Sequence, residues 1–116
     1  MIPTIAEAAG LIAAKKLSPV ELMRECQGRI AAKNDSLHAF ILQTEERALA
    51  DAKAAEARQM AGTLKGKLDG IPIAHKDIYS TAGIRTTAHS AQLLDHVPAE
   101  DAVTVAKWRE ARPPGS

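Results

Sequence analysis

The segment Gly66 to Asp77, GKLDGIPIAHKD, constrains the fold most strongly, because a turn and a short strand-like run lie here between predicted helices. A turn at residues 68–70 leads into Ile71 to Lys76, where isoleucine alternates with proline and alanine. Alternation with a period of two is typical of a short β-strand bounded by a turn. The same period places Lys76 at the strand end, on the face with the smaller side chains. We therefore expect a strand here, with helices packing around it.

Lys76 is the candidate functional residue of this segment. Neighbours that shield its ammonium group from water would favour the neutral form, which can accept a proton. Lysine is rarely buried in proteins, however, so the residues alone favour a surface or salt-bridged lysine.

The apolar residues of the chain offer little side-chain area. They make up 46% of the 116 residues, yet only one Phe, one Tyr and one Trp are present, and alanine supplies much of the rest. A chain of this length forms one domain. Because ordering each residue costs about 1.5 kcal/mol, such a thin core predicts a domain that is poorly stable on its own.

Charge and cysteine content argue against several classes of function. The 15 basic and 14 acidic residues are interspersed, so we expect no surface for nucleic acid or for an anionic membrane. The single cysteine, Cys26, lies at helical spacing between Leu22 and Ile30, which indicates a small buried apolar residue rather than a nucleophile. We expect no disulfide within the chain, no metal site and no cofactor.

The N-terminal sequence MIPTIAEAAGLIAAKK lacks the features of a targeting segment. It has no basic region followed by a long apolar run, so neither a signal peptide nor a membrane-spanning helix is expected. The cytoplasm is the expected location.

Two capping signals predict the first helices. Thr4 can cap a helix that ends near Lys15 and Lys16, cations suited to a helix C-terminus. Ser18, followed by proline and by Glu21 three residues after the cap, forms a capping box for a second helix. This second helix is expected to end at residues 34–35.

The rest of the chain is expected to alternate between strand, helix and loop. The run HAFILQ, residues 38–43, predicts a second strand, and Thr44 can cap a third helix ending at Gly62. One face of this helix is nearly all alanine, which allows close approach to a neighbour but buries little area. The helix could therefore be either solvated or tightly packed. Residues 77–101 predict a loop with one helical turn at residues 91–94, and a last helix is expected to begin with Asp101 as cap.

The run from Leu68 to Ala111 resembles the amidase signature family, which includes bacterial amidases and the A subunit of the glutamyl-tRNA amidotransferase. The resemblance is carried by these elements: Gly70-Ile71-Pro72, Lys76-Asp77, Gly83-Ile84-Arg85-Thr86-Thr87, Ser90 and Asp101-Ala102-Val103. The resemblance implies an α/β fold with a mixed sheet enclosed by helices, of which this chain is an incomplete N-terminal part. Residues 1–111 would be the N-terminal part of the amidase domain and residues 112–116 an unrelated proline-rich tail.

The family's chemistry implies roles for several residues. In that family a serine nucleophile is deprotonated by a lysine through a second serine with a cis peptide bond, and an acyl-enzyme is then hydrolysed. Lys76 matches this lysine. Asp77 would be a structural hydrogen-bond acceptor, and His89 and Ser90 would lie in the motif loop without a catalytic role.

The chain departs from the family in lacking the Gly/Ser-rich loop that carries both serines and the oxyanion hole. Ser80, Ser90 and Ser116 do not lie in that context. Loss of even one oxyanion donor costs about a hundredfold in rate, so we expect the chain to be an inactive N-terminal fragment of an amide hydrolase that acts on a small amide.

Two other functions stay open from the sequence. One is a binding module that pairs with another chain through the exposed edge of the strand at residues 71–76. The other is the A subunit of a tRNA-dependent amidotransferase, which would require partner subunits. A homo-oligomer is also left open.

Overall fold

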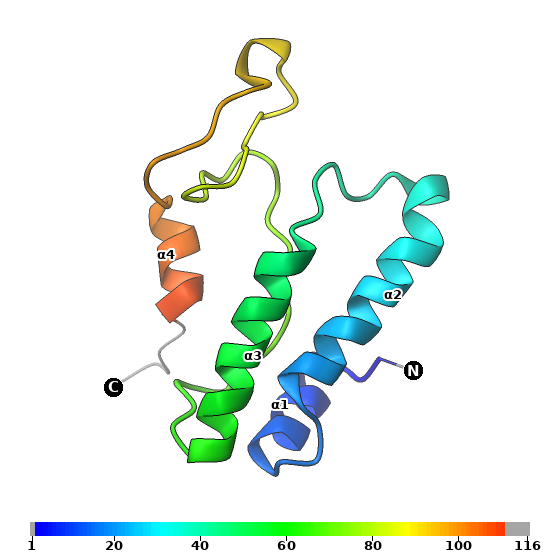
Figure 1. The fold of residues 1–116 in the computed structure, drawn as a ribbon, viewed down its shortest axis with the longest axis vertical. Coiled ribbons are helices and arrows are strands. Elements are labelled where there is room, and N and C mark those ends of the chain that lie inside the picture. The colour runs from blue at the N-terminus through cyan, green and yellow to red at the C-terminus, as the bar shows by residue number, and fades with distance from the viewer. Residues whose placement is uncertain (1, 111–116) are drawn as a thin grey trace. The chain divides into compact units, whose positions relative to one another are not determined.

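A computed structural model describes residues 2–110 of the chain (Figure 1). Its helices in chain order are α1 (Ile5–Ala13), α2 (Pro19–Leu37), α3 (Glu45–Ala61), the short 3-10 helix η1 (Ala91–Leu93) and α4 (Val103–Glu110). The chain divides into two compact units, one up to Pro72 and one from Ile73 onward, and each unit is described by itself.

Helix α1 begins where its capping residue predicts. The hydroxyl of Thr4 accepts a hydrogen bond from the Glu7 amide at 3.2 Å, and the Glu7 carboxylate accepts one from the Thr4 amide at 3.0 Å. This reciprocal pair satisfies two backbone donors that a helix start would leave unpaired. The helix buries Ala8 and Ile12, which lie four residues apart on one face.

Helix α2 also starts with a capping box. The Ser18 hydroxyl accepts from the Val20 amide at 3.0 Å, and Glu21 accepts from the Ser18 amide at 3.3 Å. The helix continues to Leu37, two residues beyond its expected end, and His38 closes it in a left-handed conformation. The Asn34 side chain does not end the helix but exchanges two hydrogen bonds with the backbone of Phe40.

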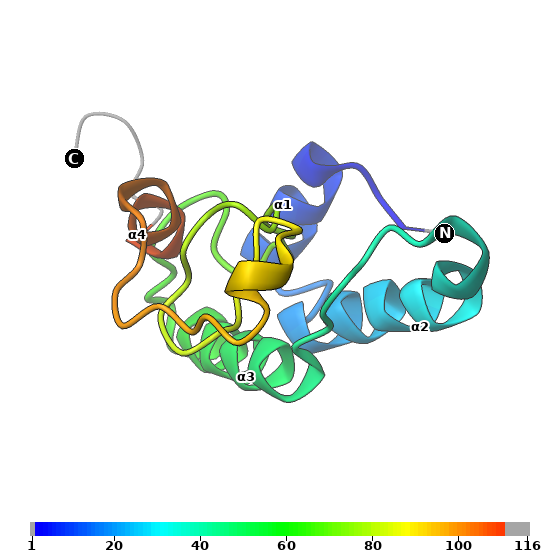
Figure 2. The same cartoon turned by 90° about the horizontal axis from the view of Figure 1, so that it is seen from above.

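Helix α3 lies beside α2, as both views show (Figures 1 and 2). The sequence left open whether α3 is solvated or tightly packed. Its alanines Ala52 and Ala55 are buried, so the helix is tightly packed. Small side chains allow the two backbones to approach closely. Gly62 ends α3 in a left-handed conformation, as expected. Thr44 occupies the N-cap position, but its side chain makes no capping hydrogen bond.

Polar side chains of α3 fix the loops of the first unit. The buried Gln59 amide donates to the carbonyls of Ile12 and Leu17, each at 2.8 Å. Arg58 forms a two-point ion pair with Asp69, at 2.8 and 2.7 Å. Around these contacts the small apolar core consists of Ala8, Ile12 and Leu22, with Leu17, Leu64 and Ile71 packed against it.

The second unit is mostly loop. The helical turn expected at residues 91–94 is present as η1, and α4 begins at Val103, two residues after the expected cap. Asp101 instead accepts from the Ala82 amide at 2.7 Å and from the Arg109 guanidinium at 3.2 Å. These bonds join the turn around Ala82 to α4.

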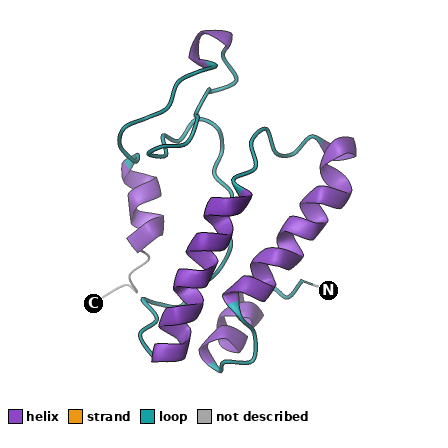
Figure 3. Cartoon of the chain, viewed as in Figure 1, coloured by secondary structure: helices purple, strands orange, loops and turns teal. Residues whose placement is uncertain are grey.

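The expected α/β fold with a mixed sheet is wrong for the part of the chain that the structure describes. Figure 3 shows helices and loops there and no strand. Residues 38–43 and 71–76, both expected to be strands, are irregular, and the one β-type pairing among the described residues is an isolated bridge between Thr81 and Ile84. A strand forms only when its backbone groups find a partner, and no described segment pairs with either run.

The expectation of an unrelated tail at residues 112–116 lies outside the described residues. Within residues 2–110, no helix has the length and the apolar character needed to cross a membrane.

Candidate functional site

Lys76 lies on an irregular segment of the second unit, and its side chain is exposed. Its carbonyl accepts a hydrogen bond from the Tyr79 amide at 3.1 Å, which turns the chain directly after it. No other described residue forms an ion pair or a hydrogen bond with its ammonium group. The residues alone left open a shielded lysine that can accept a proton and a surface lysine. In the structure Lys76 is a surface lysine. A catalytic role for Lys76 stays a prediction.

Asp77, the next residue, is held by a distant turn. Its carboxylate accepts hydrogen bonds from the Thr87 amide at 2.9 Å and from the Thr87 hydroxyl. Its own carbonyl accepts from the Ala88 amide at 2.7 Å. These bonds tie the residue next to Lys76 to residues 87–88, and the Asp77 carboxylate is the hydrogen-bond acceptor that we expected.

The hydrogen bonds also change the acidity of Asp77. The Thr87 hydroxyl contributes most, followed by the Thr87 amide, and together they hold the pKa of the Asp77 carboxyl below its usual value. The His89 amide acts in the same direction. The carboxylate is therefore ionised at neutral pH, as an acceptor of several donors requires.

The turn that binds Asp77 has an uncommon backbone. Ala88 and His89 both have a positive φ, 48° and 59°. Non-glycine residues adopt this left-handed conformation at a cost of about 1–2 kcal/mol each. The Thr87 hydroxyl accepts from the His89 amide at 3.1 Å, so Thr87 supports the strained turn while it donates to Asp77.

Two serines and one histidine lie near this turn, and the Ser90 side chain has a structural role. Ser90 caps η1 by accepting from the Gln92 amide at 3.3 Å. The Ser80 carbonyl accepts from the Ala102 amide at 2.8 Å. The His89 side chain is exposed, and Ser116 lies outside the described residues. Within residues 2–110, the side chains of Ser80, His89 and Ser90 form no hydrogen bond with the Lys76 ammonium group.

Cys26 is half-buried on α2 in the first unit. Burial raises the pKa of its thiol, and the neighbouring Glu25 carboxylate raises it further. A raised pKa reduces the thiolate fraction that a nucleophile needs, which agrees with the expected apolar role. Among residues 2–110, no three His, Cys, Asp or Glu side chains are grouped so that they could hold a metal ion.

Sequence reasoning assigned no role to Thr87, although it lies in the run that carries the family resemblance. A threonine ten residues after an aspartate gives no local signal. The partnership arises only when the loop folds back, so it required the tertiary structure.

Comparison with known proteins identifies the family. The family model described as Amidase matches residues 21–112. The A subunit of the glutamyl-tRNA(Gln) amidotransferase of Pseudomonas fluorescens (strain SBW25) is 45% identical over 108 residues, which cover 93% of this chain and 22% of that subunit. The same subunit of Azoarcus sp. (strain BH72) is 43% identical with the same coverage.

A third relative extends the match slightly. The same subunit of Thiobacillus denitrificans (strain ATCC 25259 / T1) is 41% identical over 112 residues, which cover 97% of this chain and 23% of the relative. The chain thus spans less than a quarter of the length of the curated relatives that it matches. The family match includes both Lys76 and the Asp77–Thr87 pair. The chain therefore belongs to the amidase family.

Proposed function

We propose that this chain supplies the N-terminal part, residues 1–111, of an amide hydrolase, with Lys76 as the base. The observation that carries the proposal is the family match over residues 21–112, which contains Lys76 within the family-like run from Leu68 onward. The reaction is hydrolysis of a small amide. Lys76 accepts a proton that passes from the nucleophilic serine through a second serine, and the acyl-enzyme is then hydrolysed by water.

The anchoring of Asp77 supports this role. A base needs a defined position relative to the group that it deprotonates. Asp77 is bonded through its carboxylate and its carbonyl to residues 87–88, so the backbone at Lys76 is held at one end. The exposed side chain leaves the ammonium accessible to groups supplied by other parts of an amidase.

We expect the chain by itself to be inactive. The Ser90 hydroxyl caps η1, and among the described residues neither the Ser80 nor the Ser90 side chain forms a hydrogen bond with Lys76. A base without a nucleophile and without oxyanion donors provides little rate enhancement.

A chimaera tests the proposal. Residues 1–111 would replace the matching part of the Pseudomonas fluorescens subunit, and ammonia release from a panel of small primary amides would be measured. Lys76→Ala should abolish the release, whereas Lys107→Ala, which removes another exposed lysine of the same unit, should leave it unchanged. Ammonia release that survives Lys76→Ala, or release by the 116-residue chain alone, would overturn the proposal.

A second candidate function is favoured by the names of the relatives, each of which is named as the A subunit of a glutamyl-tRNA(Gln) amidotransferase. In this case the same chemistry would release ammonia from the amide of glutamine, and partner subunits would use that ammonia to amidate a tRNA-bound glutamyl group. The distinguishing measurement is glutamine-dependent amidation of glutamyl-tRNA by the chimaera with the partner subunits of Pseudomonas fluorescens. Hydrolysis of free amides without this transfer would favour the first function. The hypothesis of a binding module that pairs through the edge of a strand at residues 71–76 is not supported, because the described residues form no strand.

A further inference from the structure

The dipeptide Asp69–Gly70, in the turn that follows α3, carries a known chemical reactivity. In an Asp-Gly pair the backbone nitrogen of the glycine can attack Cγ of the aspartate, because no glycine side chain hinders the approach. The new N–Cγ bond closes a five-membered succinimide ring, and the carboxyl OH leaves with the amide proton as water. Water then adds to the ring and breaks the bond between that nitrogen and the backbone carbonyl carbon of the aspartate. The product is an isoaspartyl residue of unchanged mass, and no oxidant or reductant is needed.

The fold of the first unit requires both residues of this dipeptide. Gly70 has a φ of 88°, and a Cβ at its position would lie 2.8 Å from Cγ of Pro19. The Asp69 carboxylate accepts two hydrogen bonds from Arg58 and one from the Lys65 amide at 3.0 Å. A glycine is needed for the turn and an aspartate for the ion pair, so packing itself places a reactive dipeptide here.

The turn keeps the two reacting atoms apart. The Ile71 amide donates to the Leu68 carbonyl at 3.1 Å, so residues 68–71 form a β-turn with Asp69 and Gly70 at its centre. Gly70 has a positive φ and Asp69 does not, which is the pattern of a type II turn, with a ψ of about 120° at the first central residue. This ψ directs the Gly70 nitrogen away from Cβ of Asp69. Ring closure needs the nitrogen on the same side as Cβ.

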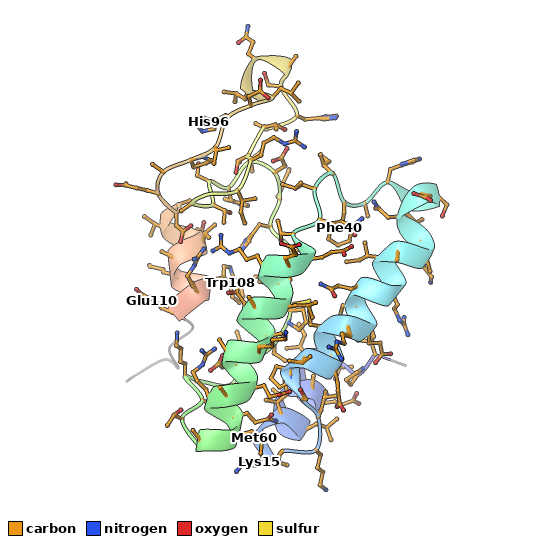
Figure 4. All side chains as sticks on the ribbon, in the orientation of Figure 1. Lys15, Phe40, Met60, His96, Trp108 and Glu110 are labelled. Carbon is orange, nitrogen blue, oxygen red and sulfur yellow. The ribbon has the colours of Figure 1, made fainter. Side chains whose placement is uncertain are left out.

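The side chain of Asp69 is also held away from the reaction. It is 7% exposed, and Arg58 bonds both of its oxygens, at 2.8 and 2.7 Å. Figure 4 shows Met60 near the C-terminal end of α3, the end that carries Arg58. The Arg58 guanidinium is the main cause that lowers the pKa of the Asp69 carboxyl. An ionised carboxylate reacts poorly with a nitrogen nucleophile, because it has no OH to release.

We propose that Asp69 is a latent site of isomerisation to isoaspartate, and that its ion pair with Arg58 keeps this site unreactive while the first unit is folded. Local opening of the pair frees the carboxyl group to approach the Gly70 nitrogen. The product has one additional backbone methylene and a carboxylate attached directly to Cα, so it restores neither the two-point ion pair nor the turn. An opening that ends in isomerisation is therefore irreversible. The inference concerns the first unit and does not depend on amidase chemistry or on Lys76.

The test measures isoaspartate at residue 69 in the 116-residue chain during incubation near neutral pH. Peptide mapping with electron-transfer dissociation distinguishes isoaspartate from aspartate. The reference is a synthetic peptide of residues 65–73, which has the same dipeptide and no Arg58. We expect the folded chain to isomerise about tenfold or more slowly than the peptide, because the reaction requires local opening. Asp69→Glu, which would need a less favourable six-membered ring, should show no isomerisation at this position.

Variants of Arg58 test the ion pair directly. Arg58→Ala should accelerate isomerisation in the folded chain by about tenfold or more, toward the rate of the peptide. Arg58→Lys keeps the charge without the two-point geometry and should give an intermediate rate. Lys53→Ala is the matched control, because it removes an exposed cation from the same helix and should leave the rate unchanged.

Gln59→Leu separates local opening from a general loss of stability. It destabilises the first unit but keeps both Arg58 and Asp69, so at an equal free energy of unfolding it should isomerise more slowly than Arg58→Ala. Circular dichroism verifies that each variant is folded during the incubation, and Arg58→Lys takes the place of Arg58→Ala if the latter is not. Equal rates in Gln59→Leu and the Arg58 variant would overturn the inference. So would a folded chain that isomerises as fast as the peptide, or Arg58 variants as slow as the unmodified chain.

Discussion

Thr87 donates both its amide and its hydroxyl to the carboxylate of Asp77, ten residues earlier in the chain. The two bonds close the loop that follows Lys76. A residue that donates both its backbone amide and its hydroxyl to one charged acceptor stabilises the loop more than a single neutral hydrogen bond would. The pair thus connects the proposed base to the family-like run around residue 87.

The first prediction concerns this pair. Thr87→Val removes the hydroxyl and keeps the shape, so the bond from the His89 amide is lost together with the charge-assisted bond to Asp77, which alone costs about 1.5–3 kcal/mol. The pKa of Asp77 should rise toward its ordinary value, as carboxyl-carbon NMR titration would show. Thr87→Ser, which keeps the hydroxyl, should restore most of the effect, and Thr104→Val on the exposed face of α4 should have none. An unchanged Asp77 pKa in Thr87→Val would contradict the structure.

The second prediction is that the fold loses stability in acid because of the Asp69–Arg58 pair. The Arg58 guanidinium is the main cause that holds the pKa of Asp69 below its usual value, with help from the Lys65 amide at 3.0 Å. A carboxyl whose pKa is lower in the folded state stabilises the fold above its unfolded pKa of about 3.9. This contribution should be lost as the pH falls from about 5 through the folded-state pKa.

Urea unfolding at several pH values measures this effect. Asp69→Asn should flatten the acid limb of the stability profile and lower stability at neutral pH, because it leaves the Arg58 side chain without its partner. Asp51→Asn, at an exposed position that pairs with Arg47 at 3.9 Å, is the control and should change stability by less than about 0.5 kcal/mol. Identical acid limbs for Asp69→Asn and the unmodified chain would refute the assignment.

The third prediction concerns Gly70, whose backbone has a φ of 88°. A Cβ at this position would lie 2.8 Å from Cγ of Pro19. Gly70→Ala should therefore add a steric clash to the cost of the left-handed backbone, and we expect a loss of about 2–5 kcal/mol.

Gly62→Ala separates the two causes. Gly62 has a φ of 73°, but nothing lies within 4 Å of the position that a Cβ would take, so about 1–2 kcal/mol of backbone strain is expected alone. The difference between the two midpoints in urea reports the contact with Pro19. Equal losses for both variants would show that the contact is absent.

The fourth prediction concerns Gln59, which donates to the carbonyl of Ile12 in the last turn of α1 and to the carbonyl of Leu17 in the α1–α2 loop. Gln59→Leu leaves the carbonyl of Leu17 without this donor, and an unsatisfied buried group costs about 1–3 kcal/mol. Gln43→Leu removes an exposed amide from the same unit and should be near neutral. A Gln59→Leu variant as stable as Gln43→Leu in urea would mean that these bonds do not form.

The fifth prediction compares two helix caps. Ser18 caps α2, and its hydroxyl also donates to the Glu56 carboxylate on α3, whereas Thr44 makes no side-chain capping bond. Ser18→Ala should therefore cost about 1–2 kcal/mol, and Thr44→Ala less than about 0.5 kcal/mol. Thermal unfolding followed by circular dichroism gives the comparison, and a reversed order would contradict the assigned caps.

The helices were predictable because their signals are local. The capping boxes at Thr4 and Ser18 and the glycine at position 62 act within one helical turn, so each is readable from a few neighbouring residues. The end of α2 was misjudged because Asn34 bonds forward to Phe40, which the residue type alone does not reveal.

The predictions of strands at residues 38–43 and 71–76 were wrong for a physical reason that a sequence pattern does not contain. Alternation at residues 71–76 describes which side chains would share a face, but a strand also needs a neighbour for its backbone. Among residues 2–110 no such neighbour exists. The side-chain pattern is therefore compatible with a strand, but it does not by itself produce one.

The sequence by itself determined the starts of α1, α2 and α3, the small apolar side-chain area and the family, because these depend on local spacing, composition and residues in a fixed order. Only the tertiary structure decided that Thr87 holds Asp77, that Gln59 spans the α1–α2 loop, and that threonines lie inside the second unit while Val103 and Trp108 lie outside. These relationships join residues far apart in the chain, and the free energy of such contacts depends on how the backbone folds back.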